Sequence, residues 1–136
     1  MYYEQNKVPT EKELKELYHS VGWFNYLTDE FTLTTLLNQS SFFITVKDNE
    51  QLIGLIRVIT DDISIVYIQD LIVLPAYQRH GMGSELLNQV LNSFQHIRQI
   101  VLLTDNEQTK RKFYEKSGLF DVSQNNCLGF MKLNTI

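Results

Sequence analysis

Cysteine, proline and glycine are all scarce in this sequence. Among 136 residues there are one cysteine, two prolines and six glycines, so neither a disulfide framework nor a proline- or glycine-rich linker is expected. The single cysteine, Cys127, stands in a strand-like run, which favours a buried thiol over a nucleophile. No histidine or cysteine cluster is present, and we therefore expect no metal site.

Charge of one sign and long apolar runs are also missing. The formal net charge is −4 with acids and bases interspersed, which offers no basic surface to nucleic acid or to an anionic membrane. There is no charged-then-apolar leader and no apolar run of about 18 residues, so we expect a cytoplasmic protein. The length and the 43% share of hydrophobic residues favour one globular domain over residues 1–136.

Two of the few glycines, Gly81 and Gly83, stand between a strand-like segment and a helix-like segment. Residues 69–74 are mostly apolar, and Leu86 and Leu87 begin an apolar pattern with helical spacing. The glycines let the backbone approach a ligand without Cβ interference. The first N–H groups of a helix lack internal partners and carry the positive end of its dipole, so this turn predicts a phosphate-binding site.

The turn fits neither of two other glycine-rich phosphate motifs. A P-loop needs Lys-Ser or Lys-Thr after its glycines, and the dinucleotide-binding motif needs a third glycine where Leu86 stands. The alternative is a strand-to-helix turn that binds no ligand, but this interpretation does not explain why Gln78 and Arg79 stand beside the glycines. Residues 78–83 resemble the Gln/Arg-x-x-Gly-x-Gly/Ala motif of the GCN5-related N-acetyltransferase (GNAT) family, whose loop holds the pyrophosphate of acetyl-CoA.

A second segment supports this resemblance. Residues 112–119 are similar to the Phe-Tyr-x-x-x-Gly-Phe motif of the family. Residues 21–23 and 67–70 are similar to segments of small bacterial members whose acceptors are unassigned. Two separated motifs are more specific than one, and the chain is identified on this basis as a small bacterial member of the GNAT family.

Helical and strand periodicities order the elements along the chain. Thr10 and Glu13 form a capping-box pattern for a helix to about Ser20, and Thr28 offers a cap for a second helix that stops near Asn38. The other expected elements are strands at residues 42–47, 52–59, 63–74 and 100–104, helices at 86–94 and 107–117, a final hairpin of 119–123 and 127–133, and a weak first strand near Tyr2. This order is also that of the GNAT fold, which implies an α/β domain with a mostly antiparallel sheet, a splayed parallel strand pair and four flanking helices.

The resemblance implies where acetyl-CoA binds. In the family, the strand before the glycine turn separates from its neighbour, and its backbone binds the pantetheine arm and the thioester carbonyl. Leu71, Ile72 and Val73 correspond to that strand, and one of their N–H groups would polarise the carbonyl as an oxyanion donor. The residues corresponding to the diphosphate site are Gln78, Arg79, His80, Gly81, Met82, Gly83 and Ser84, and the polar residue corresponding to the pantetheine contact is Asn106.

Transfer of an acetyl group to an amine needs a proton donor for the sulfur and a proton acceptor for the amine. Tyr114 matches the donor of the family and would also contact the cofactor. Tyr67 stands where many histone-type members carry a glutamate, so no base is assigned. Either a water chain through Tyr67, Gln69 or a nearby carboxylate accepts the proton, or the amine binds already neutral. By strand alternation Asp70 points to the face opposite Tyr67 and Gln69, although a bulge could reverse this.

The acceptor site is expected at an aromatic loop between the first two helices. Trp23, Phe24 and Tyr26 cluster there, and together with Gln69 they are the candidate substrate-binding residues. Aromatic rings suit an apolar or cationic amine, but Trp23 and Phe24 could equally seal the core beneath the loop.

These features together predict an acetyl-CoA-dependent N-acetyltransferase. The acetyl group would pass to a primary amine by direct attack in a ternary complex, and a small-molecule amine is favoured over a protein N-terminus or a lysine. One alternative is a non-catalytic acyl-CoA-binding or regulatory module. Another is a structural or dimerisation protein that pairs through the edge of the final hairpin. Homodimers are frequent in the family, but no feature of the sequence establishes one.

Overall fold

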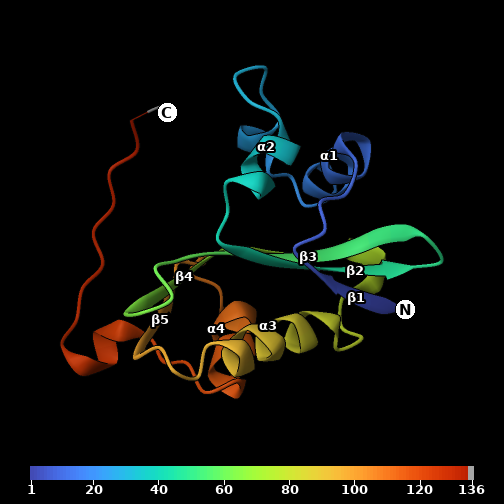
Figure 1. Cartoon of the computed structure of the whole chain (residues 1–136). Coiled ribbons are helices and arrows are strands. Elements are labelled where there is room, and N and C mark those ends of the chain that lie inside the picture. The colour runs from blue at the N-terminus through green and yellow to red at the C-terminus, as the bar shows by residue number, and fades with distance from the viewer. Residues whose placement is uncertain (135–136) are drawn as a thin grey trace. The chain divides into compact units, whose positions relative to one another are not determined.

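The computed structural model describes residues 1–134, which belong to two units (Figure 1). Unit 1 is Met1–Leu103 and unit 2 is Thr104–Ile136. None of the helices in the described residues is long and apolar enough to cross a membrane. The elements of unit 1 are β1 (Tyr2–Gln5), α1 (Glu11–Ser20), η1 (Phe24–Tyr26), α2 (Leu33–Asn38), β2 (Phe42–Asp48), β3 (Gln51–Thr60), β4 (Ile65–Val73), η2 (Pro75–Tyr77), α3 (Met82–Ser93) and β5 (Gln99–Leu102), where η denotes a 3-10 helix. Those of unit 2 are α4 (Gln108–Lys116) and η3 (Val122–Asn125).

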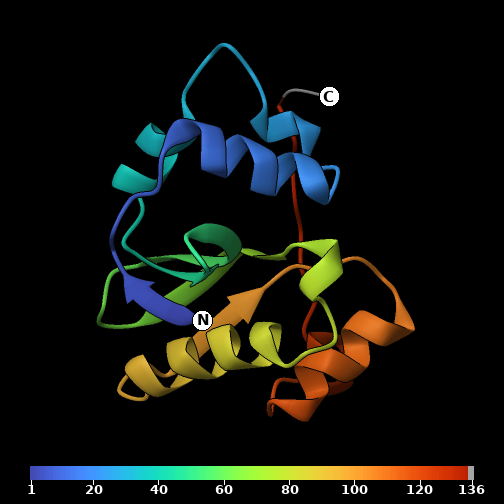
Figure 2. The same ribbon diagram turned by 90° about the vertical axis from the view of Figure 1, so that its right-hand side faces the viewer.

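The strands of unit 1 form one mixed sheet in the order β1-β2-β3-β4-β5. β1 to β4 pair antiparallel, and β4 pairs in parallel with β5, which follows α3 in the chain. α1 and α2 lie on one face of the sheet and α3 lies on the other, as Figure 1 and Figure 2 show. The predicted α/β architecture with one parallel pair and four α-helices is confirmed, and β2 to β5 lie within two residues of their predicted ends.

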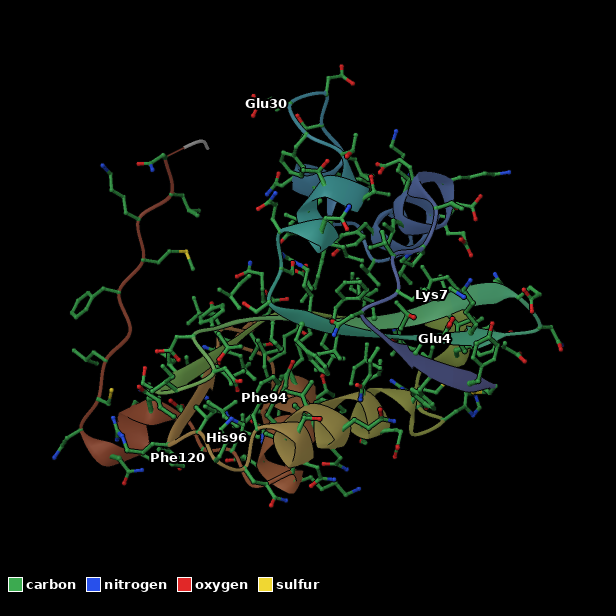
Figure 3. All side chains as sticks on the ribbon, in the orientation of Figure 1. Glu4, Lys7, Glu30, Phe94, His96 and Phe120 are labelled. Atoms are coloured by element: carbon green, nitrogen blue, oxygen red, sulfur yellow. The ribbon has the colours of Figure 1, made fainter. Side chains whose placement is uncertain are left out.

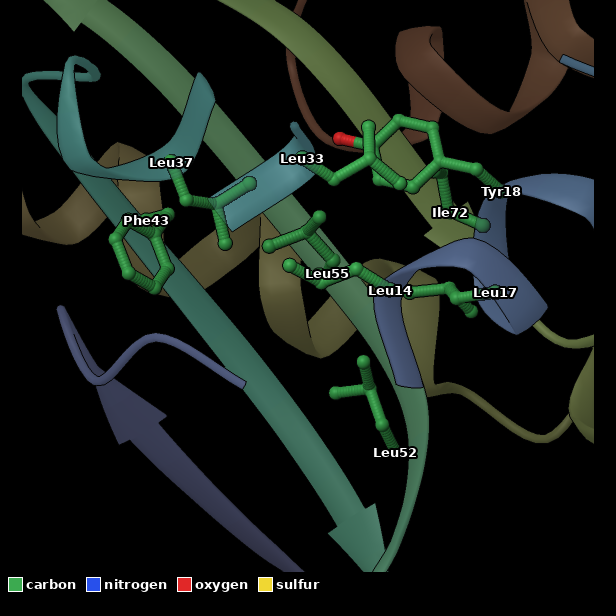
Figure 4. Close-up of a cluster of buried hydrophobic side chains, with 9 residues drawn as sticks. All are labelled: Leu14, Leu17, Tyr18, Leu33, Leu37, Phe43, Leu52, Leu55 and Ile72. Carbon is green, nitrogen blue, oxygen red and sulfur yellow. The ribbon is translucent and has the colours of Figure 1, made fainter. Parts of the chain in front are cut away.

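We call the face of the sheet that α1 and α2 cover the first face. A hydrophobic core cluster lies between these two helices and the first face (Figure 4). Leu14, Leu17 and Tyr18 recur at three- and four-residue spacing on α1, so one stripe of this helix is buried. Burial of such side chains is the main stabilising contribution to a small domain of this size. The cluster consists of Leu14, Leu17, Tyr18, Leu33, Leu37, Phe43, Leu52, Leu55 and Ile72.

The other face of the sheet is covered by α3. Leu86 and Leu87 are fully buried along the inner side of this helix. Gly54 on β3 allows the helix to approach closely, because a Cβ at that position would lie 3.3 Å from Leu86 Cδ1. Phe94, labelled in Figure 3, follows the end of α3. Its ring meets that of Phe42 edge to face, with 5.4 Å between the ring centroids. α3 is therefore held firmly against β3, and this fixes the position of its N-terminus.

The start of α1 is capped as predicted. Thr10 Oγ1 accepts a hydrogen bond from the Glu13 N–H at 3.2 Å, and Glu13 Oε1 accepts one from the Thr10 N–H at 3.0 Å. These bonds satisfy two backbone donors reciprocally, as in a capping box. Partial burial opposes the charge of the Glu13 carboxylate, but the hydrogen bonds it accepts from the Thr10 N–H and the Thr10 hydroxyl, together with nearby Lys47, outweigh burial and lower its pKa.

Thr10→Ala is expected to lower the free energy of unfolding by about 1 kcal/mol, because the first turn of α1 loses its side-chain acceptor. Urea denaturation measures this change. Thr28→Ala is the matched control, since Thr28 accepts only from the Glu30 N–H in a loop and caps no α-helix. Equal losses in the two variants would contradict the capping argument.

α2 begins later than predicted. The prediction of a cap at Thr28 is wrong, because the cap is Thr32, whose Oγ1 accepts from the Thr35 N–H. The reason is a tertiary contact: the Glu11 carboxylate, at the start of α1, accepts from the Leu33 N–H at 3.0 Å and from the next N–H of α2 at 2.9 Å. An acidic side chain from another helix thus supplies the negative charge that this N-terminus favours.

The predicted final hairpin of residues 119–123 and 127–133 is wrong. In residues 119–134, which the structure describes, η3 is the regular element and no strand forms. The Asp121 carboxylate accepts from the Ser123 N–H at 3.0 Å, a local bond that competes with pairing to another strand. Asn126 then adopts a left-handed conformation with φ 55°. The expectation of a buried thiol is also wrong, since Cys127 is exposed.

Candidate functional site

A β-bulge in β4 determines which side chains reach the first face of the sheet. Arg57 pairs with Asp70, but the next residue of β3, Val58, pairs with Ile68, so Gln69 is the extra residue. Neighbouring strand residues point to opposite faces, and the bulge shifts that alternation by one. The expectation from simple alternation is therefore corrected. Asp70 therefore shares a face with Tyr67. Their partners on β3 are Arg57 and Ile59, which are two residues apart and so point to the same face.

Pairing between the two parallel strands ends immediately before this bulge, at the last residue of β5. The last β4–β5 pair is Ile68 with Leu102, and β4 continues to Val73 with β3 on its other side. We call Ile68 the splay point. Beyond it, in the described residues, no strand pairs with the outer edge of β4, so the sheet does not use the backbone groups of residues 71–73 on that edge, although the Val73 carbonyl accepts from the Gln78 side chain. This is the arrangement expected for Leu71, Ile72 and Val73, whose ligand contacts stay a prediction.

The glycine turn, residues 78–84, joins β4 to α3. Arg79 (φ 68°) and Gly81 (φ 87°) are both left-handed, and Gly81 is the N-cap of α3. Within the part of the chain that the structure describes, none of the backbone N–H groups of residues 79–84 donates to a protein acceptor. A Cβ built on Gly81 would meet no atom within 4 Å, so the space beside Gly81 in this turn is open.

Successive free N–H groups of this kind, at the positive end of a helix, form an anion-binding concavity. The exposed Arg79 side chain can add a charge-assisted contact, and His80 is likewise exposed. Gln78 has a different part: its Nε2 donates to the Val73 carbonyl at 3.0 Å and braces the turn against the end of β4. The chemistry of the turn therefore fits a diphosphate, which the main chain would bind.

Comparison with known proteins shows which family the chain belongs to. Residues 5–128 match the sequence model of a family described as acetyltransferase (GNAT) domain. The chain belongs to the GNAT acetyltransferase family. A solved structure of the GNAT family protein SP0256 from Streptococcus pneumoniae TIGR4 is 33% identical to this GNAT chain, with a TM-score of 0.86 over 98% of this chain and 97% of that one.

Two curated relatives agree with this membership. The uncharacterized N-acetyltransferase ycf52 of Pyropia yezoensis is 27% identical over 122 residues, which are 87% of this chain and 69% of that protein. FG08082 of Gibberella zeae is 37% identical over 62 residues, which are 43% of this chain and 34% of that protein, so the match spans about a third of that relative. N-acetyltransferase is the enzyme class that the family membership indicates, and the family uses acetyl-CoA as its co-substrate.

A buried polar network lies beneath the splay point of this GNAT chain. The Asp70 carboxylate is 1% exposed and accepts from three donors: Tyr18 Oη at 2.8 Å, Tyr26 Oη at 2.9 Å and Arg57 Nε at 2.6 Å. Burial opposes the charge on Arg57, but Asp70 outweighs it and raises the pKa of the guanidinium. Burial, followed by the charge of Asp70, raises the pKa of both tyrosines.

The polar network reaches the surface at the bulge. Gln69 is exposed, and its Nε2 donates to Tyr26 Oη at 3.1 Å. Tyr67 is half-buried on the same face, and burial followed by the Asp70 charge raises the pKa of its phenol. The structure thus brings two predicted residues, Tyr26 and Gln69, into direct contact and places Tyr67 on the same strand.

The aromatic loop divides between core and surface. Trp23 and Tyr26 are partly buried against the core cluster, and both rings lie near Tyr18, at 6.2 Å and 5.0 Å between centroids. Phe24 is 59% exposed and stacks edge to face on His19. Trp23 therefore helps to seal the core beneath the loop, as one of the two interpretations expected, whereas Phe24 does not.

Unit 2 carries the other two candidates. Tyr114 lies on α4, half-buried against the Phe113 ring, and burial raises the pKa of its phenol. Asn106 is exposed in the loop before α4, next to the ion pair of Asp105 with Lys110 at 2.7 Å. The roles of both residues in cofactor binding stay predictions.

Sequence reasoning missed the residues at the centre of the polar network. Arg57 interrupts the apolar run of β3, and Asp70 interrupts that of β4. A charged residue inside an otherwise buried strand needs a partner, so two such residues on one sheet could have suggested the ion pair. Tyr18 carried no comparable signal, because its helical spacing already explained it as a core residue.

Proposed function

We propose that this chain transfers the acetyl group of acetyl-CoA to a primary amine, with a small-molecule amine as the favoured acceptor. The observation that carries the proposal is the run of free N–H groups at residues 79–84 beside the unpaired edge of β4. The first feature suits a diphosphate and the second suits an extended amide-bearing arm, and coenzyme A contains both in one molecule.

The proposed reaction is direct attack within a ternary complex. The amine nitrogen forms a bond to the thioester carbonyl carbon, while an N–H of β4 polarises the carbonyl oxygen. The C–S bond then breaks, and the departing thiolate takes the phenolic proton of Tyr114. The amine loses one proton to solvent. Because the pKa of Tyr67 is raised, its phenol stays protonated near pH 7, which favours Tyr67 as a hydrogen-bonding group rather than as the base.

Acetyl-CoA binding to the glycine turn is tested by calorimetry on the wild type and on Gly81→Trp. The new side chain would occupy the open space beside Gly81, within the turn that carries the N–H groups, and we expect at least a tenfold loss of affinity, since several charge-assisted hydrogen bonds would be blocked. Gly22→Trp is the matched control, because Gly22 also has a positive φ (77°) but lies in the aromatic loop.

The proposal predicts binding by the wild type and by Gly22→Trp, and weak or no binding by Gly81→Trp. Absence of binding to the wild type would sink it and direct attention to a structural or dimerisation role. If acetyl-CoA binds, thiol release is followed with spermidine, tyramine and a peptide with a free N-terminal amine. Binding without turnover of any amine would favour the alternative of a non-catalytic acyl-CoA-binding module.

A further inference from the structure

One branch of the polar network leads from a buried carboxylate to an exposed side chain at the splay point. Asp70 is enclosed by three donors and acts only as an acceptor. Tyr26 has one phenolic proton, which it gives to Asp70 Oδ1, so its oxygen can only accept from a further partner. That partner is the Gln69 amide, whose NH2 group must therefore face inward. The opposite end of the amide, Oε1, is left without a partner in this network.

Gln69 occupies a special position in the backbone as well. It is the bulged residue of β4, and it follows directly after the last β4–β5 pair. Bulges re-aim side chains and are over-represented next to active sites. The side chain is exposed, although both of its sequence neighbours are buried. The free edge of β4 starts at this same residue, so its side chain stands where the proposed reaction would take place.

The stability of the core does not by itself require this network. A buried ion pair has a large desolvation cost, and apolar side chains of similar volume often serve a core equally well. The Tyr18 branch ends inside the core, where Tyr18 is 0% exposed. The Tyr26 branch instead continues to the surface through Gln69.

We infer that Asp70, acting through Tyr26, holds the Gln69 amide with its carbonyl oxygen outward at the splay point, where that oxygen accepts an N–H of the amine substrate. The inference rests on the proposed acetyl transfer and assigns a positioning role to Asp70 and Tyr26. A neutral carbonyl acceptor would orient the nitrogen lone pair toward the thioester without binding the amine as a fixed cation. Arg57 neutralises the Asp70 charge, so the site should show no strong preference for polycations.

The first test is spectroscopic and needs no substrate. The side-chain NH2 signals of Gln69 in a 1H–15N NMR spectrum are assigned by their loss in Gln69→Leu. Tyr26→Phe removes the acceptor, and the Gln69 signals should move to the positions typical of a solvated glutamine. Tyr18→Phe is the matched control, because it removes the other phenol from the same carboxylate and should leave the Gln69 signals in place. Unmoved signals in Tyr26→Phe, or equal movement in both variants, would overturn the inference.

The second test uses the amine that the wild type acetylates among spermidine, tyramine and the peptide. Tyr26→Phe and Gln69→Leu are each expected to raise KM for the amine roughly tenfold, as loss of one oriented hydrogen bond would, with KM for acetyl-CoA unchanged. Combining the two changes should add little, because both break the same chain of bonds. Tyr18→Phe should lower stability and leave both KM values near those of the wild type.

The two tests separate the inference from the function on which it rests. If the wild type acetylates no amine, the proposed function fails, and the NMR result still decides whether Tyr26 holds Gln69. If the wild type is active and the NMR result is as expected, an unchanged KM for the amine in Gln69→Leu would show that this carbonyl does not bind the substrate.

Discussion

Tyr114→Phe is expected to lower kcat for acetyl transfer by about 10²-fold, the smaller end of the range for loss of a general acid. The substitution removes the phenolic proton that the departing thiolate would take and keeps the ring that packs beside Phe113. Affinity for acetyl-CoA should change little, because the proposed diphosphate contacts are at the glycine turn. Initial rates of thiol release and calorimetry on the same preparations measure the two effects separately.

The pH dependence of this reaction provides a second readout. Tyr114 must be protonated to act as an acid, and burial raises its pKa above the ordinary tyrosine value of about 10. The group therefore stays competent at every pH below that value, and kcat should show no alkaline decline from Tyr114 up to about pH 10. Tyr2→Phe, at an exposed position on β1, is the control and should behave like the wild type. A Tyr114→Phe variant with wild-type kcat would exclude Tyr114 as the donor.

Arg57→Met is expected to lower the free energy of unfolding by about 3–5 kcal/mol, the usual cost of leaving one partner of a buried ion pair without the other. Arg57 is 4% exposed and its Nε lies 2.6 Å from Asp70 Oδ2. Removing the guanidinium leaves the carboxylate buried with only two phenolic donors. Urea denaturation with a check that the m-value is unchanged gives the difference.

Arg111→Met is the matched control for that experiment. Its guanidinium lies 2.7 Å from the Asp121 carboxylate, nearly the same distance, but both side chains are about one-third exposed. Solvent screens such a pair, so the loss of stability should be far smaller. Similar losses in the two variants would show that burial is not what makes the Arg57 pair important.

The parts of this protein that local chemistry controls could be predicted from the sequence. The capping box at Thr10 joins residues three positions apart, and the left-handed Gly81 precedes a helix whose apolar spacing is visible in the sequence. The same holds for β2 to β5, because apolar runs bounded by polar turns are local patterns. The glycine turn and the order of the elements from β1 to α4 are therefore properties of the sequence itself.

Other features were decided by contacts between distant segments. The start of α2 is set by Glu11, which lies 22 residues before Leu33. The predicted final hairpin failed for the opposite reason, since the Asp121 side chain offered a local hydrogen bond that competed with strand pairing.

The candidate acceptor site depends most of all on tertiary structure. Tyr18 and Asp70 are 52 residues apart, and Tyr26 and Asp70 are 44 apart, so no sequence periodicity relates them. A one-residue bulge places Asp70 on the face of α1, and a strict alternation would have placed it on the other. The sequence by itself determined the glycine turn and the family. Only the folded sheet, with its bulge, could bring Asp70 to Tyr18 and Tyr26, because burial of the carboxylate requires donors that come from separate helices and strands.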